Sequence, residues 1–151
     1  MTGSHIFLVG PMGAGKSSLG KALASTLERA FFDVDKEIEQ RTGADIQWIF
    51  DMDGEQGFRV RESKIFLDLV NEESAAVIAT GGGLVLEAEN RKLLKRSGLV
   101  VYLSANKEQL YERTRRDKKR PLLQVEDRAS VIEQLLTIRD PLYREVADII
   151  F

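Results

Sequence analysis

The sequence has no cysteine, a single histidine and no long apolar run, and these absences exclude several kinds of protein. Without cysteine there are no disulfide bonds, thiolate nucleophiles or zinc–thiolate sites, and a cytosolic setting is expected. Acidic and basic residues number 24 and 22, and the net charge of −2 argues against a general polyanion-binding protein. No apolar stretch reaches the roughly 18 residues of a membrane-spanning helix, and the N-terminal residues lack the basic region of a signal peptide. We therefore expect a cytoplasmic protein without a membrane segment.

What is present is a regular alternation of strand-like and helix-like segments. The 151 residues are 43% apolar and 30% charged, which suits one domain spanning 1–151. Short apolar runs predict strands, and segments with helical spacing separate them; the runs are 6–9, 31–35, 76–80, 99–103 and 149–151. This alternation predicts an α/β fold, a three-layer α/β/α sandwich around a five-stranded parallel sheet.

The most specific motif is a glycine-rich loop at 10–17, between the first predicted strand and a predicted helix. Its sequence, GPMGAGKS, matches the phosphate-loop pattern G-x-x-x-x-G-K-[ST]. Glycines allow successive backbone N–H groups to point inward and bind an anion at a helix N-terminus. Lys16 then neutralises phosphate charge, and the hydroxyl of Ser17 binds Mg²⁺. The loop predicts a nucleoside triphosphate with Mg²⁺ but does not identify the acceptor.

Two acidic residues, Asp33 and Asp35, end the second predicted strand. Being two apart on a strand, both side chains are expected on one face, near the phosphate loop. One carboxylate would support the Mg²⁺ ion, and the other would orient an acceptor hydroxyl or take its proton. The alternative is structural, because Asp35 precedes a helix-like segment and is a suitable N-cap.

Three further features are ambiguous by spacing alone. Arg59 and Glu62 stand three apart on a predicted helix, which usually gives a surface ion pair; the alternative is that Glu62 fixes Arg59 to grip a substrate carboxylate. The glycines at 81–83 serve either a tight turn or the close approach of a ligand to the backbone. Arg139 has no clear role by itself.

The run 113–120 holds six basic residues in eight. A solvated face and a nucleic-acid contact are two possible readings, but no aromatic residue lies in the run for base stacking. We favour a mobile lid that supplies an arginine to the transferring phosphoryl group.

Taken together and in order, these motifs resemble the shikimate kinase family. The resemblance covers 6–151 and rests on GPMGAGKS at 10–17, FDVD at 32–35, GEQGFRVRE at 54–62, TGGG at 80–83, RPLL at 120–123 and RDPLY at 139–143. It implies transfer of the γ-phosphoryl group of ATP to the 3-hydroxyl of shikimate, in the pathway to chorismate and aromatic amino acids. It also implies a P-loop kinase fold with a substrate-binding region, about 34–62, and a lid, about 113–124.

The resemblance further implies a role for each matching residue. Catalysis would fall to Lys16, Asp35 and Arg120. ATP would be bound by Gly13, Ala14, Gly15, Lys16, Ser17, Ser18, Arg113 and Arg120. Shikimate would be bound by Asp35, Phe58, Arg59, Gly81, Gly82, Gly83 and Arg139. The Mg²⁺ ion would be held by Ser17 and, through water, by Asp33.

The sequence departs from the family pattern in one respect, and the resemblance leaves two alternative functions open. Family members usually continue past the fifth strand into an adenine-contacting loop and a final helix, and we expect both to be absent from this sequence. A related kinase with another acceptor, such as gluconate, is one rival, although two arginines favour a carboxylate. A non-catalytic nucleotide-binding module is another, although no expected catalytic position is substituted. We expect a monomer that binds no nucleic acid.

Overall fold

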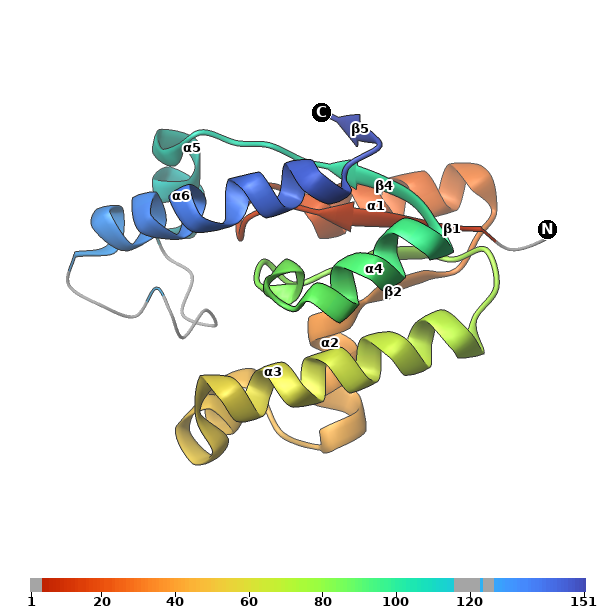
Figure 1. The fold of residues 1–151 in the computed structure, drawn as a ribbon, viewed down its shortest axis with the longest axis horizontal. Coiled ribbons are helices and arrows are strands. Elements are labelled where there is room, and N and C mark those ends of the chain that lie inside the picture. The colour runs from red at the N-terminus through yellow and green to blue at the C-terminus, as the bar shows by residue number, and fades with distance from the viewer. Residues whose placement is uncertain (1–3, 116–122, 124–126) are drawn as a thin grey trace.

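The computed structural model describes residues 4–115, 123 and 127–151, and its centre is a five-stranded parallel sheet (Figure 1). The strands lie in the order β2-β3-β1-β4-β5. Their bounds are β1 His5–Val9, β2 Phe31–Asp33, β3 Val77–Ala79, β4 Gly98–Tyr102 and β5 Ile149–Ile150. Every pair is parallel. The α/β class and the five-stranded parallel sheet expected from the sequence are confirmed.

Helices cover the two faces of this sheet unequally (Figure 1). Phe7 and Val9 of β1 point to the larger core, and Leu8 between them points to the opposite face, as strand alternation requires. The larger core packs against α3 (Ile46–Glu72), α4 (Ala88–Ser97) and α6 (Arg128–Val146). The smaller core packs against α1 (Lys16–Leu27). The remaining helices are α2 (Val34–Thr42), η1 (Leu84–Leu86) and α5 (Lys107–Thr114).

The order of the strands determines where in the fold the candidate site lies. β1 lies between β3 and β4, so the chain leaves the middle of the sheet in opposite directions on its two sides. In open parallel sheets, ligands bind at the carboxyl ends of the strands where this reversal occurs. The phosphate loop follows β1 there, and the glycines 81–83 follow β3. The fold therefore brings these two motifs side by side.

The second strand is shorter than the sequence suggested. It ends at Asp33, not Asp35, because the Asp33 carboxylate accepts hydrogen bonds from the backbone N–H groups of Asp35 and Lys36 and so caps α2. Capping of this kind begins a helix directly after the strand. Asp35 consequently lies in the first turn of α2.

Two helices that carry site residues have irregular backbones. α3 is interrupted at Gly54, whose φ of 74° and ψ of 177° divide it into two helical parts. α6 continues through Pro141, although proline supplies no backbone donor. Burial of Ile132, Tyr143 and Val146 on its inner side stabilises the helix across this point. Among the described residues, no helix is both long and apolar enough to span a bilayer.

Candidate functional site

The phosphate loop owes its shape to three glycines with positive φ. Gly10, Gly13 and Gly15 have φ values of 148°, 85° and 95°, which side chains other than hydrogen rarely tolerate. At Gly10 a Cβ atom would also stand 2.5 Å from the carbonyl oxygen of Leu103. Gly15 is the N-cap of α1, so the loop leads directly into the positive end of that helix.

The first two residues of α1 hold the loop and connect it to the next strand. Lys16 Nζ donates to the carbonyl oxygens of Gly10, at 2.5 Å, and Pro11, at 2.9 Å. Ser17 Oγ donates to Asp33 Oδ2 at 2.6 Å. Two oxygens suited to a hard cation are therefore adjacent at the loop.

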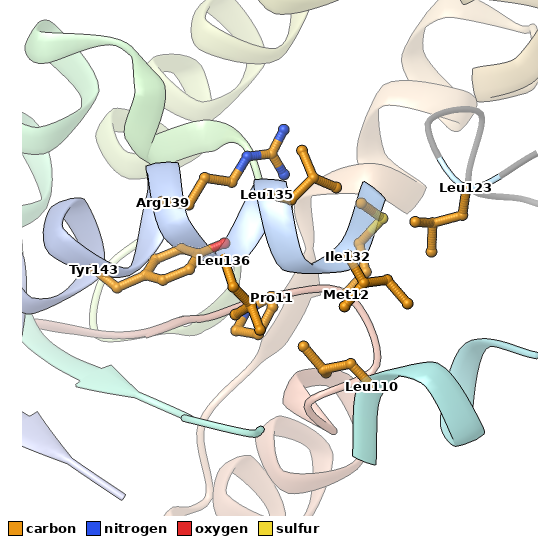
Figure 2. Close-up of a pocket in the computed structure, with 9 residues that line it drawn as sticks. All are labelled: Pro11, Met12, Leu110, Leu123, Ile132, Leu135, Leu136, Arg139 and Tyr143. Carbon is orange, nitrogen blue, oxygen red and sulfur yellow. The ribbon is translucent and has the colours of Figure 1, made fainter. Parts of the chain in front are cut away.

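A small apolar cavity lies on the side of the phosphate loop that faces α5 and α6 (Figure 2). Pro11 and Met12 face α6, and Leu110 reaches the cavity from α5. Leu110, Leu123 and Ile132 are buried together here. The phosphate loop is thus seated on an apolar cluster, which fixes its backbone without using the polar groups on its open side.

An open cleft of about 470 Å³ runs from this loop across the carboxyl edge of the sheet. Its lining includes most of the predicted nucleotide and metal residues: Gly13, Gly15, Lys16, Ser17, Ser18, Asp33 and Arg113. Asp35, Gly81 and Gly82 of the predicted shikimate site also line it. Ala14 lies in the same loop without being part of the lining. The sequence did not single out Met12, Lys36, Glu39, Ile46, Ala79 and Thr80, which also line it.

The acidic pair reaches the cleft by a different geometry from the one expected. Asp33 ends β2 and Asp35 belongs to α2, so the two are not on one strand face. The N-cap is Asp33, whereas the sequence suggested Asp35 for that role. Asp33 bonds Ser17 of the loop, while Asp35 Oδ1 stands 2.9 Å from where a Cβ on Gly81 would be. The two carboxylates therefore face different ends of one cleft.

The three glycines after β3 make room for charged side chains. None of them has a positive φ, so the backbone conformation alone does not demand glycine. A Cβ on Gly83 would lie 2.6 Å from Arg59 Nη1, one on Gly82 would lie 3.5 Å from Arg139 Nη1, and one on Gly81 would meet Glu62 Oε2 at 2.8 Å. Because these glycines have no side chains, two guanidinium groups and two carboxylates can approach one short stretch of backbone.

Arg59 and Glu62 form a buried pair, not the surface pair that their spacing usually gives. Arg59 Nη1 donates to Glu62 Oε1 at 2.9 Å, and the Glu62 side chain is only 1% exposed. Among the described residues, Arg59 Nε and Glu62 Oε2 have no hydrogen-bond partner. Burial raises the pKa of Glu62 to about 7; nearby Asp35 adds to the rise and Arg59 opposes it. The Arg59 guanidinium also lies over the ring of Phe58, 5.1 Å from its centroid.

Arg139 approaches the same glycines from α6. It is 4% exposed, and burial, with a contribution from the charge of Arg59, lowers its pKa. Four residues on, the Tyr143 hydroxyl donates to the carbonyl oxygen of Gly82 at 2.5 Å. Figure 2 shows both side chains projecting from one stretch of α6. The sequence included Tyr143 in the RDPLY motif but gave it no role.

Two predicted residues come from the basic run. Arg113 Nη1 donates to the carbonyl oxygen of Gly13 at 3.2 Å, so α5 contacts the phosphate loop. Arg120 lies outside the described residues, as does most of the expected lid.

Comparison with known proteins identifies a family. The family model described as "Shikimate kinase" matches residues 12–151. A shikimate kinase of Pasteurella multocida is 57% identical over 146 residues, covering 96% of this chain and 83% of its own. The solved structure of shikimate kinase from Acinetobacter baumannii in complex with shikimate is 53% identical, with a TM-score of 0.96, and the match covers 98% of this chain and 82% of that one.

A more distant likeness extends to the fold alone. A gluconokinase from Sinorhizobium meliloti superposes with a TM-score of 0.52 at 20% identity, covering 90% of this chain and 74% of that one. The family match spans most of the sequence, and two of the curated relatives are 53% and 57% identical to this chain over 146 aligned residues. The chain belongs to the shikimate kinase family.

Proposed function

We propose that this protein uses ATP to phosphorylate the 3-hydroxyl of shikimate, giving shikimate 3-phosphate and ADP. One observation supports the acceptor most directly. Two guanidinium groups, of the buried Arg139 and the partly buried Arg59, stand against the backbone of 81–83, next to the cleft that the phosphate loop lines. Guanidinium forks are suited to a planar carboxylate, and shikimate carries its carboxylate across the ring from the hydroxyls.

At the nucleotide end, the proposed role of the residues is to bind the phosphates of ATP and neutralise their charge. The backbone N–H groups from Gly13 to Lys16, at the start of α1, would bind the phosphates. Lys16 would exchange its bonds to the loop carbonyls for bonds to phosphate oxygens. Arg113, beside Gly13, would add positive charge on the nucleotide side. Arg120 would supply charge to the phosphoryl group in transit, as the family resemblance implies.

The residues present also fit a magnesium ion bound with ATP. Ser17 Oγ and Asp33 Oδ2 are 2.6 Å apart at the phosphate loop, and Mg²⁺ prefers such oxygen ligands together with phosphate and water. Ser17 would bind the ion directly and Asp33 through water. The ion would neutralise charge on the phosphate oxygens during transfer.

At the acceptor end, the proposed work is orientation. Arg59 and Arg139 would hold the carboxylate, while Phe58 supports Arg59 from behind. The backbone of 81–83 would line the ring. With the carboxylate fixed, the opposite side of the ring would face the phosphates and Asp35. Asp35 would orient the 3-hydroxyl and accept its proton. Positioning of this kind supplies much of the catalysis in phosphoryl transfer.

Composition supports the setting of this activity. The near-neutral charge and the absence of cysteine favour a cytoplasmic enzyme without a nucleic-acid partner. We propose that it acts as a monomer, because each residue assigned to the cleft comes from one chain.

The experiment is ADP release from Mg-ATP with shikimate, with gluconate and with no acceptor. Release that depends on shikimate is expected, together with a shift of the shikimate resonances beside the 3-position. Release that depends on gluconate would overturn the acceptor assignment. Tight ATP binding without release in any arm would overturn the activity and favour a nucleotide-binding module.

A further inference from the structure

We infer that Tyr143 is a positioning residue, whose buried hydroxyl holds the carbonyl of Gly82 and so fixes the backbone against which Arg139 is placed for the acceptor carboxylate. The inference rests on the proposed function, since it concerns how that carboxylate is recognised. Tyr143 is itself placed too far back to serve as a ligand, because its side chain is fully buried.

The hydroxyl bridges two parts of the acceptor end. It donates its proton to the carbonyl oxygen of Gly82 at 2.5 Å. On the same glycine, a Cβ atom would lie 3.5 Å from Arg139 Nη1. The hydroxyl therefore fixes the backbone against which the Arg139 guanidinium stands.

Arg139 needs such support. Its guanidinium is buried next to Arg59, and two like charges oppose close approach. Glu62 is hydrogen-bonded to Arg59 through Oε1, and Glu55 also forms an ion pair with Arg59. A neutral hydroxyl that holds the backbone beside Arg139 keeps the guanidinium in place without neutralising it. The positive charge stays available for the substrate.

The ring of Tyr143 is held as firmly as its hydroxyl. It packs against the ring of Tyr102 on β4, with centroids 5.0 Å apart. Tyr102 is also buried, but its hydroxyl donates to Asp140 Oδ1 at 2.6 Å in a part-buried bond, whereas the bond from Tyr143 to Gly82 is buried. Tyr102 therefore serves as a comparison: a second buried tyrosine ring whose hydroxyl has a different partner.

The test compares Tyr143→Phe with Tyr102→Phe. Each variant loses one hydroxyl hydrogen bond, and we expect a loss in Tm of about 2–4 °C from each. Only Tyr143→Phe should raise KM for shikimate, by about fivefold to tenfold, with KM for ATP unchanged. Equal shikimate KM values in the two variants, or a rise in KM for ATP alone, would overturn the inference.

A second readout isolates the carboxylate. The carboxamide of shikimate has the same ring and hydroxyls without the negative charge. The wild-type preference for shikimate over the carboxamide, measured as a ratio of kcat/KM values, should shrink in Tyr143→Phe and persist in Tyr102→Phe. An unchanged ratio in Tyr143→Phe would contradict the inference. If the wild-type enzyme itself shows no shikimate-dependent turnover, the proposed function fails first, and the two failures are distinct.

Discussion

The two ends of the cleft are built in different ways. The phosphate end comes from one continuous stretch, 10–17, whose conformation follows from its glycines and the helix after it. The acceptor end is assembled from α3, the glycines 81–83 and α6, which lie far apart in the sequence. A local motif fixes the first, and tertiary packing fixes the second. Substitutions should therefore separate the two ends cleanly.

The largest expected effect is at the phosphate end. Replacing Lys16 with Ala removes the cation placed for the transferring phosphoryl group, and we expect kcat to fall by about 10²–10³-fold. Shikimate binding, measured calorimetrically, should remain because Lys16 is not at the acceptor end. The matched control is Lys21→Ala, which removes an exposed lysine from the same helix and should leave kcat unchanged. Loss of shikimate affinity in Lys16→Ala would contradict the separation.

The second largest effect is expected at the acceptor end, where shikimate binding should weaken while nucleotide binding is kept. Arg59→Ala removes one of the two guanidinium groups proposed to bind the carboxylate and leaves Glu62 buried without its partner. We expect KM for shikimate to rise by at least about thirtyfold, with little change in nucleotide affinity. Arg61→Ala is the control, since Arg61 pairs with Asp53 on the surface and such pairs contribute little. An equal loss of ATP binding in Arg59→Ala would count against the assigned role.

Two glycine substitutions separate site geometry from stability. Gly83→Ala is compatible with the backbone φ of −100° but places a Cβ against the Arg59 guanidinium. KM for shikimate should rise about tenfold with a small loss of stability. Gly43→Ala has open space around its Cβ but a φ of 74°, so Tm should fall while KM is unchanged. The same outcome from both variants would show that contact with Arg59 is unimportant.

The smallest effect is on the pH dependence of stability. The pKa of Glu62 is raised to about 7 from 4.5, so the folded protein binds the proton more tightly than the unfolded chain. The free energy of unfolding should therefore fall as the pH rises from about 4.5 to about 7. This contribution is absent in Glu62→Gln. When the free energy of unfolding is measured by denaturant titration and plotted against pH, the slopes for the wild-type protein and the variant should differ by up to about 1.4 kcal/mol per pH unit. Parallel pH profiles would show that Glu62 titrates normally.

The sequence predicted the local features well because they depend on neighbouring residues. The phosphate loop is fully specified by Gly10 to Ser17, and alternating segments predicted the parallel sheet. These predictions needed no information about which segments touch.

Features that depend on contacts between distant segments were harder to predict. Asp35 was expected on the strand, because strand periodicity does not reveal that the Asp33 carboxylate caps α2 and that β2 ends at Asp33. The spacing of Arg59 and Glu62 favoured a surface pair, and only the packing of α3 on the glycines shows that Glu62 is buried. Tyr143 carried no signal of its own, because a tyrosine at helical spacing usually belongs to the core.

The interruption at Gly54 has a consequence for engineering. It makes α3 two modules joined at one residue: 46–53, which brings Ile46 to the cleft wall, and 55–72, which carries Arg59 and Glu62. Phe50 and Phe58 stack across the junction, with ring centroids 4.8 Å apart. If Gly54 and this stacked pair are kept, the first module can be exchanged for a bulkier or more polar one while the carboxylate anchor stays in place. We therefore expect that substitutions in 46–53 can change which acceptor is selected, while 55–72 keeps the acceptor in the same orientation.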